Sequence, residues 1–551
     1  MSSSPAARLF LGLDLSTQQL KAIVIAQDST LVHESAVHFD NDLPSYGTTN
    51  GAIRGPGDGE VTSPVAMWLE AIDLLFDRLK EAGVEVSAIA AIAGAAQQHG
   101  SVYWSKDAEA LLASLDPAQS LASQLSPGAF SLPTAPIWQD SSTMQECRKL
   151  EESVGGPQAL ADLTGSRAYE RFTGNQIAKI RRLQREAYDA TSRISLVSSF
   201  IPSVFLGRIA PIDSSDASGM NLMDVITCKW NDTLVEACGG PELRSKLGPE
   251  PVIGGTVLGK VSKWWVGRWG LSPECVVAPF TGDNPASVVA LSAPGDAVLS
   301  LGTSTTFLLS IPGGDTPPKR FTTWHLLSHP TDFHGKIAML CYKNGALARE
   351  QVRDRYADRD WSRFNELIEA TPPGNDGYFG LYFPLPEIIP PGVVGQHAFH
   401  AKSLEKGVLP SPVDGIPTNA HPRAILESQF LSIRSRIAAI LPENSPPLQH
   451  LVATGGSSAN QTIRQLAADI FGMKVFVSST KEAAGMGGAL LAKYAWWKAA
   501  HGRNGTFEDM TGGEIAGLQC VAEPREDVSG IYEKLVDLYR ACEDQVVLKS
   551  A

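Results

Sequence analysis

The stretch Leu11-Gly12-Leu13-Asp14-Leu15-Ser16-Thr17 lies at the centre of the first structural pattern in the chain. An apolar run over residues 9–13 ends at Asp14, and polar turn residues follow at 16–19. A second apolar run covers residues 20–26. Apolar runs bounded by turn residues at this spacing predict a β-hairpin, which residues 31–39 extend into a meander.

The same pattern returns nearly 290 residues later. Residues 297–301 form an apolar run, Gly302-Thr303-Ser304-Thr305 a small polar turn, and residues 307–311 another apolar run. Two similar hairpins that open halves of comparable length suggest a duplicated domain. Strand–turn–strand units are also common in any large α/β protein, so the repeat alone leaves both interpretations open.

Helical periodicity alternates with these strands. Trp68, Ile72, Leu75, Phe76 and Leu79 recur at the spacing of one helix face, just after Ser63-Pro64. Residues 89–93 are again apolar and lead into a loop rich in glycine and glutamine. Strands that alternate with helices predict an α/β fold with a mixed sheet.

A third segment has the order strand, glycine turn, helix. Residues 448–454 read as a strand, Gly455-Gly456-Ser457-Ser458 as a tight turn, and residues 460–471 as a helix. This order puts backbone N–H groups and a helix N-terminus at a sheet edge, which suits a nucleotide. The chain has no Walker A sequence, and a Gly-Gly pair is often only a turn.

Two further segments have an unusual composition. Residues 482–494 read as a helix rich in glycine and alanine, which predicts close backbone packing or close approach of a ligand. Residues 371–422 are rich in proline and glycine but keep several aromatic residues. We expect an ordered, irregular excursion there.

Composition excludes several classes of protein. The 551 residues include 46 Lys plus Arg and 59 Asp plus Glu, for a net charge of −13, which argues against a general nucleic-acid binder. No apolar run reaches the ~18–20 residues that span a bilayer, so no membrane partner is expected. Seven scattered cysteines without CxxC spacing are typical of reduced thiols. We therefore expect a cytoplasmic protein. The oligomeric state is not readable from the sequence.

Two acidic residues stand out by their context. Asp14 ends an apparently buried strand beside hydroxyl residues, where a carboxylate can hold a hydrated Mg²⁺ that faces phosphates. Asp283 lies in Thr281-Gly282-Asp283-Asn284, after another apolar run, where it could act as a general base on a substrate hydroxyl. A turn-former or helix N-cap is the structural alternative for each.

A polar loop, Gln97-Gln98-His99-Gly100, follows the predicted strand at 89–93. Amide and imidazole groups both donate and accept hydrogen bonds without net charge, which suits a neutral polyol. Arg171 could likewise reach a sugar oxygen. A structural histidine and a surface arginine are the alternatives for His99 and Arg171.

Taken together, these motifs resemble the FGGY family of carbohydrate kinases, and within it the eukaryotic type that acts on D-xylulose. The resemblance rests on motifs that occur in the family's order over about residues 9–495. They are Leu11-Gly12-Leu13-Asp14-Leu15-Ser16-Thr17, Gln97-Gln98-His99-Gly100-Ser101-Val102-Tyr103-Trp104, Ile137-Trp138-Gln139-Asp140, Ser215-Asp216-Ala217-Ser218-Gly219-Met220, Thr281-Gly282-Asp283-Asn284-Pro285-Ala286-Ser287, Ser300-Leu301-Gly302-Thr303-Ser304, and Ala453-Thr454-Gly455-Gly456 followed by Asn460. Ala96 departs from the glycine expected before the Gln-Gln-His run; it removes no reacting group.

The resemblance implies an α/β fold of two actin-like ATPase (ribonuclease H-like) domains with a cleft between them. Residues 1–290 would form the N-terminal domain, mainly sugar-binding, and residues 291–551 the C-terminal domain, mainly ATP-binding. The implied reaction is ATP-dependent phosphorylation of D-xylulose to D-xylulose 5-phosphate, with Mg²⁺ as cofactor.

The resemblance also assigns roles to individual residues. Asp283 becomes the catalytic base, and Asp14 the carboxylate near Mg²⁺. The sugar contacts are Gln98, His99, Arg171, Asp283 and Asn284. The ATP contacts are Thr17, Gly302, Thr303, Trp361, Gly455, Gly456, Ser457 and Asn460.

Two other functions stay open at this point. One is a kinase for another ketose or for a polyol, because the stereochemistry of the accepted hydroxyl is not readable from one sequence. The other is a non-catalytic, nucleotide-gated sugar-binding protein, because actin-like domains also serve such uses. Gln98-His99 and Asp283-Asn284 argue for a small hydroxylated ligand in either case.

Overall fold

The computed structural model describes residues 8–403, 409–441, 448–480, 482–502, 504–513, 515 and 517–550. The chain divides into two compact units by its internal contacts. The first comprises the described parts of Met1–Leu291, Leu326–Ile337 and Glu482–Ala516, and the second those of Ser292–His325, Ala338–Lys481 and Gly517–Ala551. Two segments from the C-terminal half of the sequence, 326–337 and 482–516, therefore belong to the first unit.

The first unit is built on a six-stranded sheet in the order β12-β13-β6-β1-β2-β3. Strand β1 pairs antiparallel with β2 and parallel with β6, and β6 pairs parallel with β13. The predicted meander is confirmed, because β2 also pairs antiparallel with β3. Its strands are β1 Leu9–Leu15, β2 Gln19–Ala26, β3 Leu31–His38, β6 Ile89–Ala96, β12 Gly259–Lys260 and β13 Val276–Gly282.

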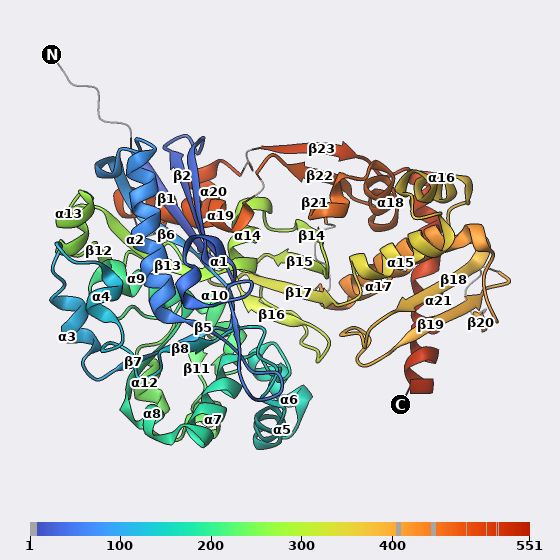
Figure 1. Ribbon diagram of the computed structural model, residues 1–551. Coiled ribbons are helices and arrows are strands. Elements are labelled where there is room, and N and C mark those ends of the chain that lie inside the picture. Colours follow the sequence, from blue (N-terminus) through green and yellow to red (C-terminus); the bar gives the residue numbers. More distant parts are fainter. Residues whose placement is uncertain are drawn as a thin grey trace, which may run out of the picture. The chain divides into compact units, whose positions relative to one another are not determined.

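Smaller strand groups complete this unit, and Figure 1 labels most of its elements. They are β4 Ile53–Arg54, β5 Val61–Pro64 and β8 Thr134–Pro136; β7 Ser101–Ser105 and β9 Thr191–Leu196; and β10 Met223–Asp224 and β11 Lys229–Trp230. The helices are α1 Phe39–Asp42, α2 Val65–Glu81, α3 Ala108–Ala113, α4 Leu121–Leu125, α5 Met144–Ser153, α6 Pro157–Thr164, α7 Thr173–Leu183, α8 Arg185–Ala190, α9 Val197–Leu206, α10 Ser214–Ala217, α11 Asp232–Gly239, α12 Leu243–Leu247, α13 Lys263–Trp269, α14 Asp283–Leu291, α19 Ala483–His501 and α20 Phe507–Thr511.

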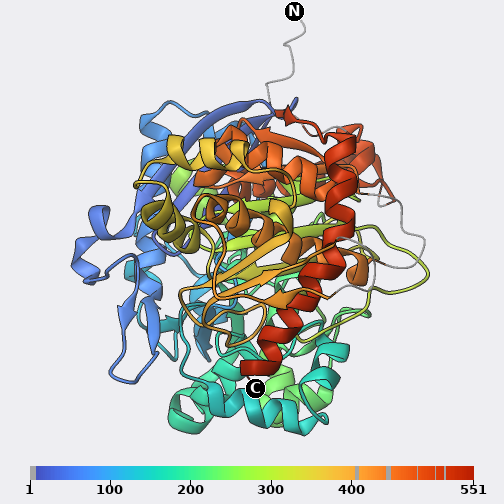
Figure 2. The same ribbon diagram turned by 90° about the vertical axis from the view of Figure 1, so that its right-hand side faces the viewer.

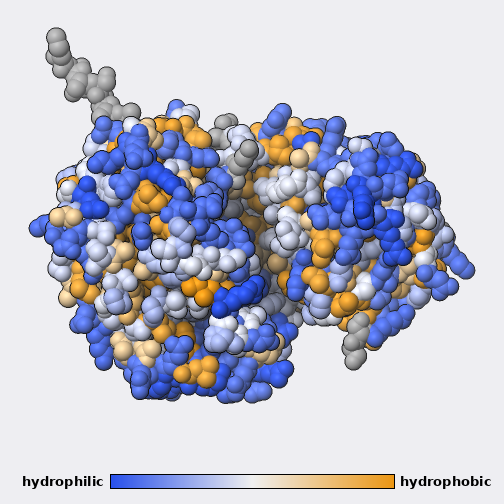
Figure 3. All heavy atoms as spheres, in the orientation of Figure 1, coloured by the Kyte–Doolittle hydropathy of each residue, from blue (hydrophilic) through white to orange (hydrophobic). Residues whose placement is uncertain are grey.

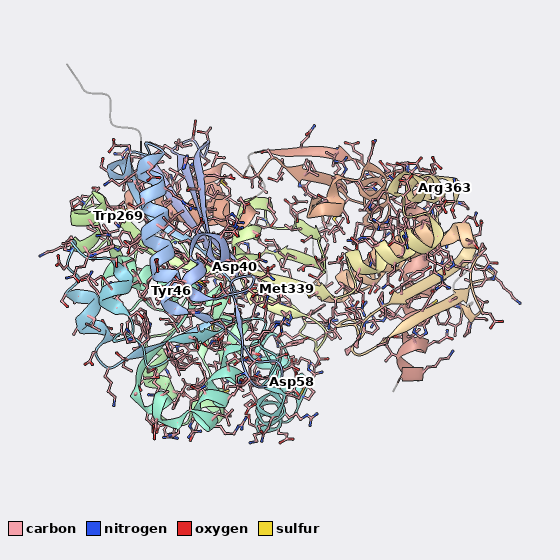
Figure 4. All side chains as sticks on the ribbon, in the orientation of Figure 1. Asp40, Tyr46, Asp58, Trp269, Met339 and Arg363 are labelled. Carbon is pink, nitrogen blue, oxygen red and sulfur yellow. The ribbon has the colours of Figure 1, made fainter. Side chains whose placement is uncertain are left out.

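Helix packing follows the predicted periodicity. Trp68, Ile72 and Phe76 of α2 are fully buried, as their spacing on one helix face requires. Phe76 packs against Trp269 of α13, whose position Figure 4 labels, with ring centroids 5.6 Å apart. The predicted helix after Ser63-Pro64 is thus confirmed, and aromatic side chains hold it against its neighbours.

The second sheet has seven strands in the order β16-β17-β15-β14-β21-β22-β23. Strand β14 pairs antiparallel with β15 and parallel with β21, which pairs parallel with β22. Strand β23 closes this edge antiparallel to β22, as β12 does against β13 in the first sheet. The strands are β14 Ala297–Leu301, β15 Thr305–Ile311, β16 His325–Ser328, β17 Lys336–Tyr342, β21 His450–Thr454, β22 Lys474–Ser478 and β23 Leu518–Ala522.

The two sheets thus share one arrangement around the two hairpins. Reading outward, β2-β1-β6-β13-β12 and β15-β14-β21-β22-β23 have the same order and the same sequence of antiparallel and parallel pairings. The hairpin repeat in the sequence therefore corresponds to a repeat of topology, which supports duplication over a chance strand–turn–strand match.

The helices of the second unit are α15 Ala346–Tyr356, α16 Trp361–Ala370, α17 His421–Ile440, α18 Gln461–Phe471 and α21 Glu526–Ser550. The predicted helix after the Gly455-Gly456 turn is confirmed as α18. Figure 2 shows α21 as a long helix in this unit, where it packs against α17 and α18.

The expectation of an irregular excursion over residues 371–422 was wrong in part. It contains a three-stranded antiparallel sheet of β18 Tyr378–Phe383, β19 Gly395–His400 and β20 Ser411–Pro412. The aromatic residues of β18 pack inward, with Phe379 and Phe383 buried. Residues 404–408 of this segment lie outside the described residues. The prolines and glycines stand mainly between the strands, where they mask the strand pattern.

Small residues bring helix α19 against the first sheet, which confirms the close packing predicted from its composition. A Cβ atom on Gly12 of β1 would lie 2.2 Å from the backbone nitrogen of Ala489, and one on Gly488 would lie 2.6 Å from Cα of Gly94 in β6. Only glycine permits backbone contact this close. At the surface, the face drawn in Figure 3 is mostly hydrophilic, with small groups of apolar residues.

Candidate active site

Three parallel strands of the first unit end side by side. Leu15 of β1 is in register with Ala96 of β6, and Ala96 with Gly282 of β13. The residues that follow or end these strands are Asp14, the Gln97–His99 loop and Asp283. The first sheet thus brings the main sugar-side candidates together at the carboxyl edge, where ligands of open α/β sheets bind.

Asp14 lies near the end of β1 and is 3% exposed. The hydroxyl of Ser16 donates to its Oδ2 at 2.7 Å, whereas its Oδ1 is buried and accepts no hydrogen bond within the described chain. Burial raises the pKa of this carboxyl to about 6. A buried carboxylate oxygen without a partner fits a cation or its bound water, since Mg²⁺ usually takes one or two carboxylates and keeps several waters.

Asp283 is the first residue of α14, directly after β13. The backbone N–H of Asn284 donates to its Oδ1 at 2.8 Å and the side-chain amide of Asn284 donates to the same oxygen at 3.1 Å. Burial, followed by the charge of Asp14, raises the pKa of Asp283 to about 7. A carboxyl that ionises near neutrality, with its second oxygen not engaged by these bonds, can accept a proton from a hydroxyl.

Gln98 joins Asp283 to a buried carboxyl. Its Oε1 accepts a hydrogen bond from the side chain of Asn284 at 3.0 Å, and its Nε2 donates to Oδ1 of Asp216 at 3.4 Å. The structure therefore brings together Gln98, Asp283 and Asn284, three of the five predicted sugar contacts. Asp216, on the short helix α10, belongs to the same cluster.

His99 is held as a neutral ring. Its backbone has φ 70° and its Nδ1 lies 2.9 Å from the carbonyl oxygen of Gly219, which can only accept. Burial, with a smaller contribution from the Arg171 charge, lowers the pKa of His99 to about 3. Nδ1 therefore carries the proton, and Nε2 is left as a hydrogen-bond acceptor.

Arg171 lies close to this ring through Phe172. The Phe172 ring stacks on His99 at 4.5 Å between centroids, and the Arg171 guanidinium lies 5.9 Å from the centre of the Phe172 ring and 5.1 Å from that of Tyr169. The aromatic contacts orient the guanidinium beside the imidazole. Arg171 therefore lies in the same region as His99, the other predicted sugar contact outside the Gln98–Asn284–Asp283 cluster.

Thr17 lies in the turn between β1 and β2. The indole N–H of Trp138 donates to its hydroxyl at 2.8 Å, and a Cβ atom on Gly51 would lie 1.8 Å from its carbonyl oxygen. Asp40, labelled with Tyr46 in Figure 4, braces the loop that carries Gly51 by accepting from Thr48 Oγ1 at 2.6 Å and from the Gly51 N–H at 3.0 Å. The turn is thus supported from both sides.

In the second unit, two loops meet at the carboxyl edge of β14 and β21. Ser300 is in register with Thr454, so the Gly302-Thr303 turn and the Gly455-Gly456-Ser457 loop begin side by side. Gly455 has φ +81°, and a Cβ atom there would lie 2.8 Å from the backbone carbon of Leu301. At Gly456 a Cβ atom would meet nothing within 4 Å in the described part of the chain beyond its two neighbours.

Arg349 on α15, which the sequence reading did not single out, connects these two loops. It is fully buried and donates to Thr305 Oγ1 at 3.3 Å, to Gln429 Oε1 at 2.8 Å and to Ser457 Oγ at 3.3 Å. Burial lowers its pKa to about 10, and the charge of Glu350 offsets this only in part. A buried cation of this kind favours a nearby anion. The sequence signal was weak, because Arg349 follows Gly345-Ala346-Leu347-Ala348, a stretch without a polar side chain.

Asn460 caps helix α18 and ties it to α16. Its Oδ1 accepts from the backbone N–H of Ile463 at 3.2 Å, and its amide donates to Asn365 Oδ1 at 2.9 Å. Trp361 begins α16, one turn before Asn365, and its ring lies 4.7 Å below the Arg353 guanidinium. The second unit therefore groups Gly302, Thr303, Gly455, Gly456, Ser457 and Asn460, with the helix of Trp361 alongside.

Comparison with known proteins now identifies the class. Residues 130–290 match the N-terminal domain of the FGGY family of carbohydrate kinases, and residues 297–496 match its C-terminal domain. The chain belongs to the FGGY family of carbohydrate kinases, and the resemblance inferred from the motifs is confirmed.

Particular relatives are similar over nearly the whole chain. A xylulose kinase of Rattus norvegicus is 41% identical over 555 residues, which cover 100% of this chain and 99% of the relative. Xylulose kinase 2 of Arabidopsis thaliana is 42% identical, over 90% of this chain and 88% of the relative.

Solved structures support the fold. A crystal structure from Brucella ovis, described as a xyloylose kinase, has a TM-score of 0.76 and 20% identity, covering 98% of this chain and 100% of that one. Plasmodium falciparum glycerol kinase with ADP has a TM-score of 0.72 and 15% identity, covering 98% of each chain. The expected α/β fold of two actin-like domains is confirmed. Among the described residues, no helix is both long and apolar enough to cross a bilayer.

Proposed function

We propose that this chain is an ATP-dependent kinase that converts D-xylulose and ATP into D-xylulose 5-phosphate and ADP in the cytoplasm. The carrying observation is Asp283, a carboxyl with one oxygen held by two N–H donors, in a hydrogen-bonded cluster with Gln98 and Asn284. The full-length similarity to curated xylulose kinases supports D-xylulose as the substrate.

The sugar is proposed to bind mainly to the first unit. Nε2 of His99 would accept a hydrogen bond from one sugar hydroxyl, while Arg171 would donate to another oxygen. Asn284 can offer its carbonyl oxygen, because its NH₂ group is engaged by Gln98 and Asp283. This mixture of donors and acceptors suits a neutral, hydroxyl-rich molecule.

ATP is proposed to bind mainly to the second unit. Backbone N–H groups of the two loops would hold phosphate oxygens, and the buried charge of Arg349 would favour them from below. Trp361 and Asn460 would lie on the adenosine side. The proposed ATP contacts are Thr17, Gly302, Thr303, Trp361, Gly455, Gly456, Ser457 and Asn460.

Magnesium is proposed to be held through water by Asp14, whose Oδ1 has no other partner within the described chain. When bound, Mg²⁺ supplies charge neutralisation for the phosphate oxygens. Asp14 would hold that ion through water and would not contact the sugar.

The chemical step then needs alignment and one proton acceptor. The 5-hydroxyl oxygen forms a bond to the γ-phosphorus, the bond from that phosphorus to the β–γ bridging oxygen breaks, and ADP leaves with the electron pair. Asp283 positions the hydroxyl and takes its proton late in the step, as the loose character of phosphoryl transfer allows. Its pKa near 7 makes the acceptor form available at neutral pH.

The direct test is to mix the purified chain with Mg-ATP and D-xylulose and identify the phosphorylated product. Steady-state assays across pentuloses, hexuloses and pentitols then rank the substrates by kcat/KM. D-Xylulose is expected to rank first. A better hexulose or pentitol would keep the family and replace the substrate, and ATP turnover indifferent to every sugar would contradict the kinase.

A further inference from the structure

Asp216 lies one step behind the residues proposed to touch the sugar. It is 1% exposed, on the short helix α10. Its Oδ2 accepts from the Ser198 hydroxyl at 2.6 Å, and its Oδ1 accepts from Nε2 of Gln98 at 3.4 Å. The groups that act on this carboxyl within the described residues are the neutral side chains of Ser198 and Gln98 and the acidic Asp213, so it is buried without charge compensation, at a cost in stability.

The hydrogen bonds from Asp216 to Asp283 have a fixed direction. A carboxylate accepts only, so the NH₂ group of Gln98 must face Asp216. The carbonyl of Gln98 must then face Asn284, whose NH₂ group donates to it at 3.0 Å and to Oδ1 of Asp283 at 3.1 Å. The acceptor at Asp216 therefore sets the orientation of both side-chain amides, those of Gln98 and Asn284.

The direction survives protonation of Asp216. A proton on Oδ2 would point to the Ser198 oxygen, which can accept as well as donate, and Oδ1 would still accept from Gln98. The groups around Asp283 are Asp14 on β1, Asp216 on α10, and the neutral side chains of Gln98 and Asn284. Lys21 and Glu482 act on Asp14.

We propose that Asp216 is a positioning residue that acts through Gln98 and Asn284. By orienting both amides, it keeps the side-chain N–H of Asn284 on Oδ1 of Asp283, beside the backbone N–H of the same residue, and leaves Oδ2 for the sugar hydroxyl. The proposal rests on the proposed role of Asp283 as base. Without the acceptor at position 216, the Gln98 amide can reverse and its NH₂ group would face that of Asn284, so that Asp283 would keep only the backbone N–H of Asn284 as a donor to Oδ1 and would be held less firmly.

The test uses a matched pair of buried carboxyls. Asp213 is as buried as Asp216 and accepts from the Thr281 hydroxyl at 2.6 Å and the Asp216 N–H at 3.0 Å, but it has no hydrogen bond to Gln98, Asn284 or Asp283. Asp216→Ala is expected to lower kcat at least ~10-fold while the xylulose Kd changes less than ~3-fold. Asp213→Ala should keep kcat within ~3-fold, whatever its effect on thermal stability.

Two further measurements distinguish a positioning role of Asp216 from a role in the stability of the fold: rescue by asparagine and the combination with a Gln98 variant. Asp216→Asn, whose amide oxygen still accepts from Gln98, should keep kcat within ~3-fold of the parent. Gln98→Met breaks the chain of bonds without changing Asp216 and should itself lower kcat about as much as Asp216→Ala does. In the Gln98→Met background, Asp216→Ala should add less than a twofold loss. Asp216→Leu, which fills the site without an acceptor, replaces the alanine variant if that variant does not fold.

Equal kcat losses for Asp216→Ala and Asp213→Ala would overturn the proposal, as would independent losses in the Gln98→Met background or an asparagine variant as slow as the alanine one. Different results would contradict the proposed function: a parent chain that does not phosphorylate D-xylulose, or an Asp283→Asn variant that keeps its rate.

Discussion

At the residue scale, burial gives His99 and Asp283 opposite changes in pKa but the same charge preference. It lowers the pKa of the imidazole to about 3 and raises that of the carboxyl to about 7, so that both groups favour their neutral forms. His99 is therefore fixed as a neutral hydrogen-bonding group at every physiological pH. Asp283 stays at the edge of ionisation, where it can exchange a proton.

Asp283→Asn separates a base from a mere sugar anchor. The amide keeps the size of the side chain but cannot take the hydroxyl proton, and general-base assistance is typically worth 10²–10⁴-fold. We expect kcat to fall at least ~100-fold, while the xylulose Kd, measured directly by calorimetry, changes less than ~15-fold, since a neutral hydrogen bond is worth about 0.5–1.5 kcal/mol. A folded variant with kcat within tenfold of the parent would leave Asp283 as a sugar contact only.

The raised pKa of Asp283 also predicts a pH dependence. Below a pKa of about 7 the carboxyl is mostly protonated and cannot serve as base, so kcat/KM for xylulose should rise with pH, reach half its maximum near pH 7 and level above it. The slope on the acid side should approach tenfold per pH unit. Initial rates from pH 5 to pH 9, with stability checked at each pH, measure it, and a profile flat down to pH 5 would contradict the assignment.

Individual site residues differed in how far the sequence could predict them. Asp14, His99 and Asp283 follow apolar strands in short polar motifs, so local pattern was enough to nominate them, and the family resemblance assigned their roles. The contacts of Arg349 and the contact of Asp216 with Gln98 join residues 44 to 118 positions apart in the chain, and no local pattern encodes those contacts.

At the element scale, the loop after β21 contains two glycines in different surroundings: Gly455 is packed against backbone, and Gly456 has open space beside it. A Cβ atom at Gly456 meets no described residue other than its chain neighbours within 4 Å, so a valine side chain there would extend into the space proposed for ATP. Gly456→Val should raise the KM for ATP far more than that for xylulose, with an unchanged melting temperature. Steady-state kinetics with each substrate varied, beside a thermal melt, measure both effects.

The neighbouring glycine provides the contrast for that prediction. Gly455 has φ +81° and backbone within 3 Å of its would-be Cβ, so Gly455→Val should lower the melting temperature. Equal effects of Gly456→Val on both substrates, or a loss of stability like that of Gly455→Val, would show that Gly456 does not face the nucleotide.

Helix packing gives a second prediction at this scale. A Cβ atom on Gly487 of α19 would lie 1.9 Å from the carbonyl oxygen of Ala286 in α14, whereas one on Gly530 of α21 would meet nothing within 4 Å. Gly530→Ala should stabilise the protein by about 0.5–1 kcal/mol, because alanine favours the helix. Gly487→Ala should destabilise it by about 1–3 kcal/mol, because the helix must shift. Denaturant titration of both variants measures the change in the free energy of unfolding. A change of the same sign in both variants would contradict the packing described for Gly487 and Gly530.

The sequence predicted elements best where one periodicity ran undisturbed. Both hairpins, helix α2 and the strand–turn–helix around Gly455 follow from apolar spacing and turn residues. The sheet of β18, β19 and β20 was missed because prolines and glycines surround short strands, and strand pairing across a segment is not a local property.

At the scale of the whole molecule, the proposed division of labour can be tested with one ligand at a time. D-Xylulose alone should slow amide hydrogen exchange around residues 97–100 and 171–173, and ADP alone around residues 302–305 and 455–460, because bound ligand suppresses local opening. Sucrose at equal concentration controls for the effect of added sugar. If D-xylulose protected residues 302–305 and 455–460 and ADP protected residues 97–100 and 171–173, the roles assigned to residues 1–290 and 291–551 would be reversed.

The hairpin repeat suggested a duplicated domain and the family resemblance implied two domains, but neither predicted the path of the chain through them. The hairpins mark where each half begins. The return of residues 482–516 to the first unit depends on glycines of α19 that fit against β1 and β6, and their steric match is visible only in three dimensions.

That return has a consequence during synthesis. Helix α19 completes the packing of β1, yet more than 460 residues separate Leu15 from Ala483, so a chain emerging from the ribosome has its first sheet long before the helix that packs against it. The apolar surface of that sheet must wait, exposed or shielded by chaperones, until translation is nearly finished. Fragments that stop before residue 482 should therefore aggregate when they are produced without the rest of the chain.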